Sequence, residues 1–310
     1  MSDTTPLILD APGPHAAGRT RSWAGWAQVA VLGGLVCLVY WPVLSGMVYK
    51  WRTDGNWSHG FLVPVFSLYF LMVHRRTWMT CRRRADYLGL VLILASLGLL
   101  YGSMAYGGFG YPQALSLIPC LWGLVWFLGG RDLLKAVWFP IAFLICAIPL
   151  PQSYYFQLTL PLRRLASHSA AALLGLLPGV ETEVRGVVIE YDYLGRAAAL
   201  NVEEACSGMR LMMSFVTLGI AMAYLGDRPL WQRLVMIVSC APIAVFCNMI
   251  RVFVTGVLYV YGHEDWAQGT IHGLLGLAML PIALGLFAAV GYVLSNLFVE
   301  TSEPEASGSA

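Results

Sequence analysis

Long apolar runs are the feature that most limits how this chain can fold. Eight of them recur along its 310 residues, at about 24–44, 60–74, 87–106, 113–129, 132–150, 206–225, 231–260 and 271–297. A helix needs ~20 such residues to cross the hydrocarbon core of a bilayer, and it satisfies its own backbone hydrogen bonds there. We therefore predict an all-α polytopic membrane protein with about eight transmembrane helices.

The composition agrees with a chain that is embedded in a membrane. Hydrophobic residues make up 58% of the sequence and charged residues only 12%, whereas a soluble domain has about 25% charged residues. The formal net charge is +2 and no long basic face stands out, which implies no nucleic-acid partner. Residues 1–22 and 298–310 are polar and are expected to be disordered tails. They flank one transmembrane domain at 23–297.

The positions of Lys and Arg predict the orientation of the helices, because short basic loops stay on the cytoplasmic side. The connections after the first, third and seventh runs hold only Lys50 and Arg52. The connections after the second, fourth and sixth runs hold Arg75, Arg76, Arg82, Arg83, Arg84, Arg131, Lys135, Arg228 and Arg233. Both termini are therefore expected in the cytoplasm, and the loop 150–205 on the outer side.

The outer loop is expected to contain structure of its own. Residues 159–179 have apolar residues at helical spacing, with Arg163, Arg164 and His168 on the other side. This pattern is typical of a helix that lies in the membrane interface. Residues 180–202 include VRGVVIEYDY, in which β-branched and aromatic residues nearly alternate. We predict a small β-hairpin or strand pair before the sixth transmembrane helix.

Cys206 stands apart from the other six cysteines. No Cys-x-x-Cys pair occurs, and most cysteines lie singly inside apolar runs, where a free cysteine packs as a small hydrophobe. Cys206 lies in EEACSGMR, residues 203–210, where a polar segment changes into an apolar run. A helix N-terminus and a nearby cation both favour the reactive thiolate. Cys206 is therefore a candidate nucleophile, with packing at a helix start as the alternative.

Two arginines are candidate partners of Cys206, because charged groups inside a bilayer are costly and usually functional. Arg210 follows Cys206 by four residues, which places both on one helical face. Arg251 lies inside the 231–260 run. The chain descends ~29 Å over residues 206–225 and rises ~30 Å from 231 to Arg251, so Cys206 and Arg251 should share a level.

His272 opens the last apolar run at the same outer end. It could carry a proton from the thiol to a leaving group, while Arg251 would stabilise a developing oxyanion. A straight helix would continue ~15 Å beyond Arg251. The chain must therefore descend after residue 261, or the helix must tilt or bend, for which Pro242 is a candidate position.

Several neighbouring residues are supporting candidates. Glu203 and Glu204 precede the helix and suit its positive end, and Arg210 either helps hold the thiolate or pairs with one of them. Ser207 adjoins the nucleophile, and Asn248 could support Arg251 or bond to a neighbouring helix. No metal or cofactor is expected, because the remaining histidines lack the spacing of metal ligands and suit interface or loop positions: His59, His74, His168 and His263.

In combination, these motifs resemble those of the exosortase and archaeosortase family of membrane transpeptidases. The matching elements are EEACSGMR, the NMIR of residues 248–251, and His272, in the order found in the family. The motif match covers about residues 150–297 and is specific only as a set. The resemblance implies that Cys206, Arg251 and His272 are catalytic, and the histidine favours the bacterial branch.

The resemblance also implies substrates and a location. The substrates would be exported proteins with a C-terminal tripartite signal: a motif such as Pro-Glu-Pro, one transmembrane helix and a basic tail. The chain would be an exosortase-like multi-pass protein of the bacterial inner membrane, with its active site on the outer side. Cys206 would form an acyl thioester that water or another acceptor resolves. Membrane lipids and exopolysaccharide-synthesis proteins are further expected partners.

Two other classes of function remain open at this point. One is a transporter or flippase for a lipid-linked saccharide, in which Arg210 and Arg251 would bind anions; the lack of paired half-sequence symmetry argues against it. The other is a scaffold in exopolysaccharide export, in which no single thiol should matter. Replacement of Cys206 separates these alternatives from the peptidase.

Overall fold

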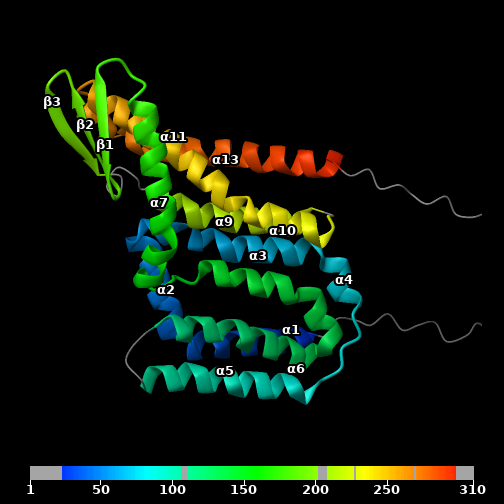
Figure 1. Cartoon of the computed structure of the whole chain (residues 1–310). Coiled ribbons are helices and arrows are strands. Elements are labelled where there is room, and N and C mark those ends of the chain that lie inside the picture. Colours follow the sequence, from blue (N-terminus) through cyan, green and yellow to red (C-terminus); the bar gives the residue numbers. More distant parts are fainter. Residues whose placement is uncertain (1–22, 106–109, 202–207, 227, 269, 298–310) are drawn as a thin grey trace, which may run out of the picture. The chain divides into compact units, whose positions relative to one another are not determined.

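The computed structural model describes residues 23–105, 110–201, 208–226, 228–268 and 270–297 (Figure 1). The described residues fall into two compact units that divide after Leu44, and the second contains nearly all of the elements discussed below. The early elements are α1 (Trp23–Val39), α2 (Trp41–Thr53), the 3-10 helix η1 (Gly55–Phe61), α3 (Leu62–Val73), α4 (Arg75–Thr80), α5 (Tyr87–Ala105), α6 (Tyr111–Phe143) and the 3-10 helix η2 (Leu144–Ala147). The later helices are α7 (Gln152–Leu174), α9 (Gly208–Leu225), α10 (Leu230–Val238), α11 (Cys240–Val260), α12 (Glu264–Gln268) and α13 (Thr270–Leu297).

The described helices confirm an all-α polytopic membrane fold, but the number of spans differs from the predicted eight. Five stretches are long and apolar enough to cross a membrane: Gly55–Val73, Tyr87–Ala105, Tyr111–Ala147, Leu230–Val260 and Gly273–Asn296. The bent pair Ala27–Val39 and Trp41–Thr53 makes six if it counts as one span. Met213–Leu225 is apolar but shorter.

One part of this difference in number arises at Gly130, inside the longest helical stretch. Gly130 has a φ of 80° and a ψ of −178°, so the helix is interrupted there. The indole Nε1 of Trp122 donates to the carbonyl of Trp138 at 3.0 Å, although sixteen residues of straight helix would separate the two by ~24 Å. The two halves of α6 therefore lie side by side and correspond to the predicted helices at 113–129 and 132–150.

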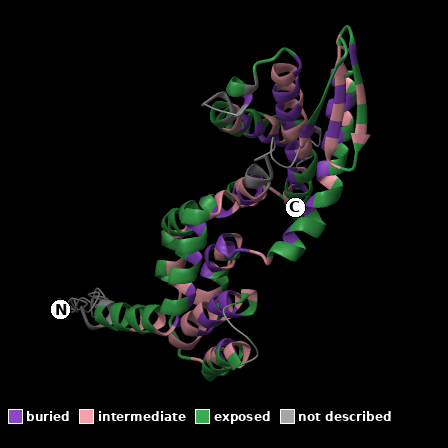
Figure 2. Ribbon diagram, turned by 90° about the vertical axis from the view of Figure 1, so that its left-hand side faces the viewer, coloured by how far each residue is buried: buried purple, intermediate pink, exposed green. Residues whose placement is uncertain are grey.

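Apolar side chains remain exposed along the spans, as Figure 2 shows by its green stretches on the helices. In α5, for example, Val91 is 62% exposed. Surfaces of this kind are solvated by lipid chains in a bilayer.

The insert before α9 is a three-stranded antiparallel sheet, in the order β1 (Val180–Arg185), β2 (Val188–Tyr193) and β3 (Arg196–Asn201). Tyr193 pairs with Arg196, which leaves a two-residue turn at Leu194 and Gly195. Both turn residues have positive φ, 52° and 80°, as the tight turns of hairpins require. The predicted strand pair is thus present, with β3 as a third strand.

Helix α7 precedes the sheet and packs against α11 and β1. Figure 1 shows it running across the ends of α3 and α9 rather than alongside them. The prediction that Arg163 lies on a solvated face is wrong, because Arg163 is buried, in line with Ala166 and Ala170. Its guanidinium lies 4.9 Å from the ring centre of Phe156, and such a cation–π contact partly compensates a buried charge.

The predicted helix at 231–260 is interrupted at Ser239, between α10 and α11. Pro242 lies three residues later, in the first turn of α11. A proline is tolerated in a first turn but clashes with the carbonyl four residues before it. This accounts for a break at this point, close to the position considered from the sequence.

Candidate active site

Three helices that pack against one another carry several of the predicted site residues. Arg210 is in α9, Arg251 in α11 and His272 in α13, and each of these helices contacts the other two. Figure 1 shows α9, α11 and α13 as neighbours in one region of the bundle. Helices that are far apart in the sequence thus lie side by side.

The contact at Gly219 fixes how the three helices are aligned. A Cβ atom on Gly219 of α9 would collide with the Sγ atom of Cys240 in α11 and would lie 3.2 Å from the ring of Phe287 in α13. From this contact we count eleven residues along each helix toward the same end of the bundle. The count reaches Gly208 in α9, Arg251 in α11 and Gly276 in α13, each ~16 Å from the contact at 1.5 Å per residue. This count treats the helices as straight and parallel, and on that basis the three positions share one level.

Direct contact confirms part of this alignment. A Cβ atom on Gly276 would lie 3.7 Å from Nη2 of Arg251, so the guanidinium lies against the backbone of α13 with no side chain between them. Gly276 follows His272 by four residues, which is about one helical turn. Arg251 therefore lies beside the turn of α13 that begins at His272.

Arg251 is 1% exposed and belongs to a polar stripe on α11. Asn248, Arg251 and Thr255 follow one another at spacings of three and four residues, which places them on one helical face. Oδ1 of Asn248 and Oγ1 of Thr255 are buried and have no hydrogen-bond partner in the described part of the chain. A buried polar group without a partner costs about 1–3 kcal/mol, and polar groups inside apolar helices are usually functional.

Thr255 was not among the residues predicted from the sequence. The available signal was its spacing of four residues from Arg251. That signal is weak, because threonine also occurs in membrane helices with its hydroxyl bonded to the carbonyl one turn earlier. The buried, unpartnered Oγ1 of Thr255 is what makes it a candidate.

The nucleophile candidate and its direct neighbours lie outside the described residues. These are Glu203, Glu204, Cys206 and Ser207. Arg210 and His272 are described as positions in α9 and α13, and their side chains lie outside the described part. The thiol and its distances to Arg251 and His272 remain predictions. Cys206 comes two residues before Gly208, which lies at the level of Arg251.

A second polar group lies in η1, which packs against α9. His59 is 7% exposed, although the sequence suggested an interface or loop position for it. Its Nε2 atom is 3.2 Å from the carbonyl oxygen of Cys146, and its Nδ1 atom is buried with no partner among the described residues. Nearby, the hydroxyl of Tyr155 donates to Oδ1 of Asn56 at 3.2 Å. This polar cluster adjoins α9 and could not be recognised from the spacing of histidines.

The chemistry available at the described site is electrostatic. A guanidinium keeps its proton and its charge, and burial among apolar side chains strengthens its action on nearby charge. Among the described residues, no group of three or more His, Cys, Asp or Glu side chains could hold a metal ion. Arg251 is therefore suited to stabilise negative charge that develops at its level, between α9 and α13.

Comparison with known proteins gives one match. A family model described as transmembrane exosortase matches residues 51–289, which include all the predicted catalytic residues. No curated protein and no solved structure matches the chain.

Proposed function

Because the chain belongs to the transmembrane exosortase family, we propose that it is a membrane-embedded cysteine peptidase with transpeptidase activity. Its substrates are exported proteins that end in a Pro-Glu-Pro-like motif, a transmembrane helix and a basic tail. The active site faces the outer side of the bacterial inner membrane, with both termini in the cytoplasm.

The observation that carries this proposal is the buried stripe around Arg251. Arg251 is 1% exposed and contacts the turn of α13 that follows His272. By the residue count above, it lies level with the start of α9, and α9 begins two residues after Cys206. A permanent buried charge is the group that would stabilise the oxyanion of covalent catalysis, and it supports the proposed pairing with Cys206 and His272.

The proposed reaction has two halves. His272 takes the thiol proton of Cys206, and the sulfur forms a bond with the carbonyl carbon of the scissile peptide. Negative charge passes to the carbonyl oxygen, where Arg251 stabilises it. When the C–N bond breaks, His272 gives the proton to the leaving amine. Water or an acceptor amine then attacks the thioester carbon and gives a proton to His272, the C–S bond breaks, and His272 returns the proton to the sulfur of Cys206.

The test is processing of a co-expressed reporter protein with such a tripartite tail. Cys206→Ala and Cys206→Ser should abolish processing, because neither side chain provides a thiolate, while the protein level and membrane insertion persist. Cys37→Ala is the matched control, since Cys37 is an exposed cysteine of α1, and it should process the reporter normally.

The same experiment separates the alternatives. Undiminished processing by both Cys206 variants would overturn the peptidase. A transporter or an export scaffold would not process the reporter at all, so processing that the unmodified protein performs and both Cys206 variants lose excludes both alternatives.

A further inference from the structure

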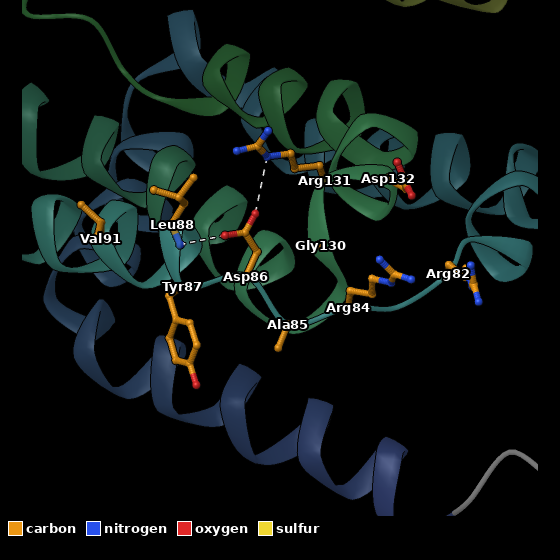
Figure 3. Close-up of a pocket in the computed structure, with 10 residues that line it drawn as sticks. All are labelled: Arg82, Arg84, Ala85, Asp86, Tyr87, Leu88, Val91, Gly130, Arg131 and Asp132. Carbon is orange, nitrogen blue, oxygen red and sulfur yellow. Dashed lines mark hydrogen bonds and ion pairs between the residues drawn. The ribbon is translucent and has the colours of Figure 1, made fainter.

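A cavity with charged side chains on its rim lies at one end of the α5–α6 pair, far along the chain from the candidate active site. It has a volume of about 570 Å³ and lies between the 82–86 segment and the reversal of α6 at Gly130 (Figure 3). The backbone fixes its walls: the amide of Arg84 donates to the carbonyl of Gly129 at 3.4 Å, and the amide of Asp86 to that of Phe127 at 3.3 Å. A Cβ atom on Gly130 would lie 2.6 Å from the carbonyl oxygen of Arg84. The segment therefore sits directly on the α6 reversal.

Asp86 is the acidic group at the centre of this cavity, and the chain itself satisfies it. Its carboxylate accepts from the amide of Leu88 at 3.0 Å and from the indole of Trp126 at 2.9 Å, and it pairs with Nε of Arg131 at 3.5 Å. These contacts, chiefly the Leu88 amide, lower the pKa of Asp86. The carboxylate is thus ionised and holds Arg131 in place.

Basic side chains dominate the rim. Arg131 is 63% exposed although it is anchored, and Arg82 and Arg84 are exposed on the opposite edge of the cavity (Figure 3). Segments 75–84 and 131–135 together contain seven basic residues. The acidic residues at this end are Asp86 and Asp132, so the net charge of the region is +5. An anion is therefore attracted to this end of the helices.

The other side of the cavity is apolar and continues onto a membrane-spanning helix. Leu88 and Val91 line it and are exposed on α5, which is one of the candidate spans. A ligand that fills the whole site must carry negative charge at one end and hydrocarbon at the other. A free phosphate satisfies only the first of these conditions.

We propose that this cavity binds the phosphate headgroup of an anionic phospholipid, with an acyl chain along Leu88 and Val91 of α5. The arginines at 82, 84 and 131 contact the phosphodiester, and Asp86 orients Arg131 without repelling the ligand, because its charge is already paired. Basic pockets between transmembrane helices are known to bind lipid headgroups in this way. The lipid would connect the 82–86 segment to the α6 reversal.

The test uses the full-length protein, purified in dodecyl maltoside and depleted of lipid. Dioleoyl-phosphatidylglycerol or dioleoyl-phosphatidylcholine is then added, and native mass spectrometry measures how much of each lipid binds. The variant Arg82→Gln/Arg84→Gln changes two rim residues, and Arg75→Gln/Arg76→Gln on α4 is a control with the same change in net charge outside the cavity. Arg82→Lys/Arg84→Lys keeps the charge and shows whether a folded protein with altered side chains still binds.

Phosphatidylglycerol should bind in preference to phosphatidylcholine, and binding should fall about fivefold for each rim arginine removed. The α4 control and the lysine variant should retain most of the binding. Equal losses in the rim and α4 variants would overturn the proposal, since they would indicate attraction to net charge alone. Equal binding of phosphatidylcholine would also overturn it. The proposal would also be overturned if inorganic phosphate raised the midpoint of thermal unfolding as much as the lipid does, because free phosphate would then be the ligand.

Discussion

At the scale of single residues, the polar stripe of α11 distinguishes groups that stabilise the fold from groups that serve a reaction. Asn248 and Thr255 each bury an oxygen that has no partner in the described part of the chain. Such groups lower stability relative to apolar side chains of the same shape. Their presence on either side of Arg251 is therefore better explained by function than by folding.

Thr255→Val tests this explanation, because the two side chains have nearly the same shape. Removal of the unpartnered hydroxyl should leave the free energy of unfolding unchanged or raise it by about 1 kcal/mol. Processing of the tripartite-tail reporter should nevertheless slow if the hydroxyl contacts substrate. Thermal unfolding in detergent and the rate of reporter processing are the two measurements. A large loss of stability would show instead that the hydroxyl has a structural partner.

At the scale of elements, apolar periodicity predicted the location of the helices but not how they join. The runs at 113–129 and 132–150 were separated correctly, because Gly129, Gly130 and Arg131 interrupt the hydropathy. The resulting side-by-side pairing depends on the positive φ of Gly130, which hydropathy does not encode. Strand β3 was missed as a separate strand because RAAALN lacks β-branched and aromatic residues.

For the site, the sequence predicted what depends on spacing along single helices. Arg251 was expected at the level of Cys206 because residue counts convert directly into rise along a helix, and that pairing stays a prediction because Cys206 lies outside the described residues. The burial of Arg163 and His59 could not be predicted in the same way. It depends on the ring of Phe156 and on the carbonyl of Cys146, which the tertiary fold brings close.

The α5–α6 contact provides a prediction at this scale, because two glycines allow the backbones to touch. A Cβ atom on Gly89 would lie 2.6 Å from the carbonyl oxygen of Gly123, and small residues at such contacts let membrane helices approach closely. Gly89→Ala should therefore lower the free energy of unfolding by about 1–3 kcal/mol. The measurement is the midpoint of thermal unfolding in detergent.

Gly98→Ala is the matched control on the same helix. Nothing lies within 4 Å of a Cβ atom at Gly98, so alanine should stabilise α5 there by about 0.5–1 kcal/mol. Equal effects of the two substitutions would mean that the close approach at Gly89 does not support the fold.

At the scale of the larger unit, in its described residues, basic loops and the predicted site residues lie toward opposite ends of the helices. Helix α9 has Gly208, level with Arg251, at one end and Gly226 at the other. At the second end, Nη1 of Arg228 donates to the carbonyl of Gly291 in α13 at 2.8 Å. Figure 1 shows the sheet at one end of α3 and α9 and helix α4 at the opposite end. The basic loops and the candidate active site are thus separated by the length of these helices.

This separation predicts opposite accessibility of two single cysteines. One variant keeps only Cys81, which is partly exposed just after α4. The other carries only Arg196→Cys, at an exposed position that begins β3. A membrane-impermeant maleimide added to intact spheroplasts should label Arg196→Cys and should label Cys81 only after permeabilisation, because basic loops are retained inside. Labelling of both cysteines from the same side would contradict the proposed orientation, and labelling of Cys81 alone would reverse it and place the candidate site in the cytoplasmic half of the membrane.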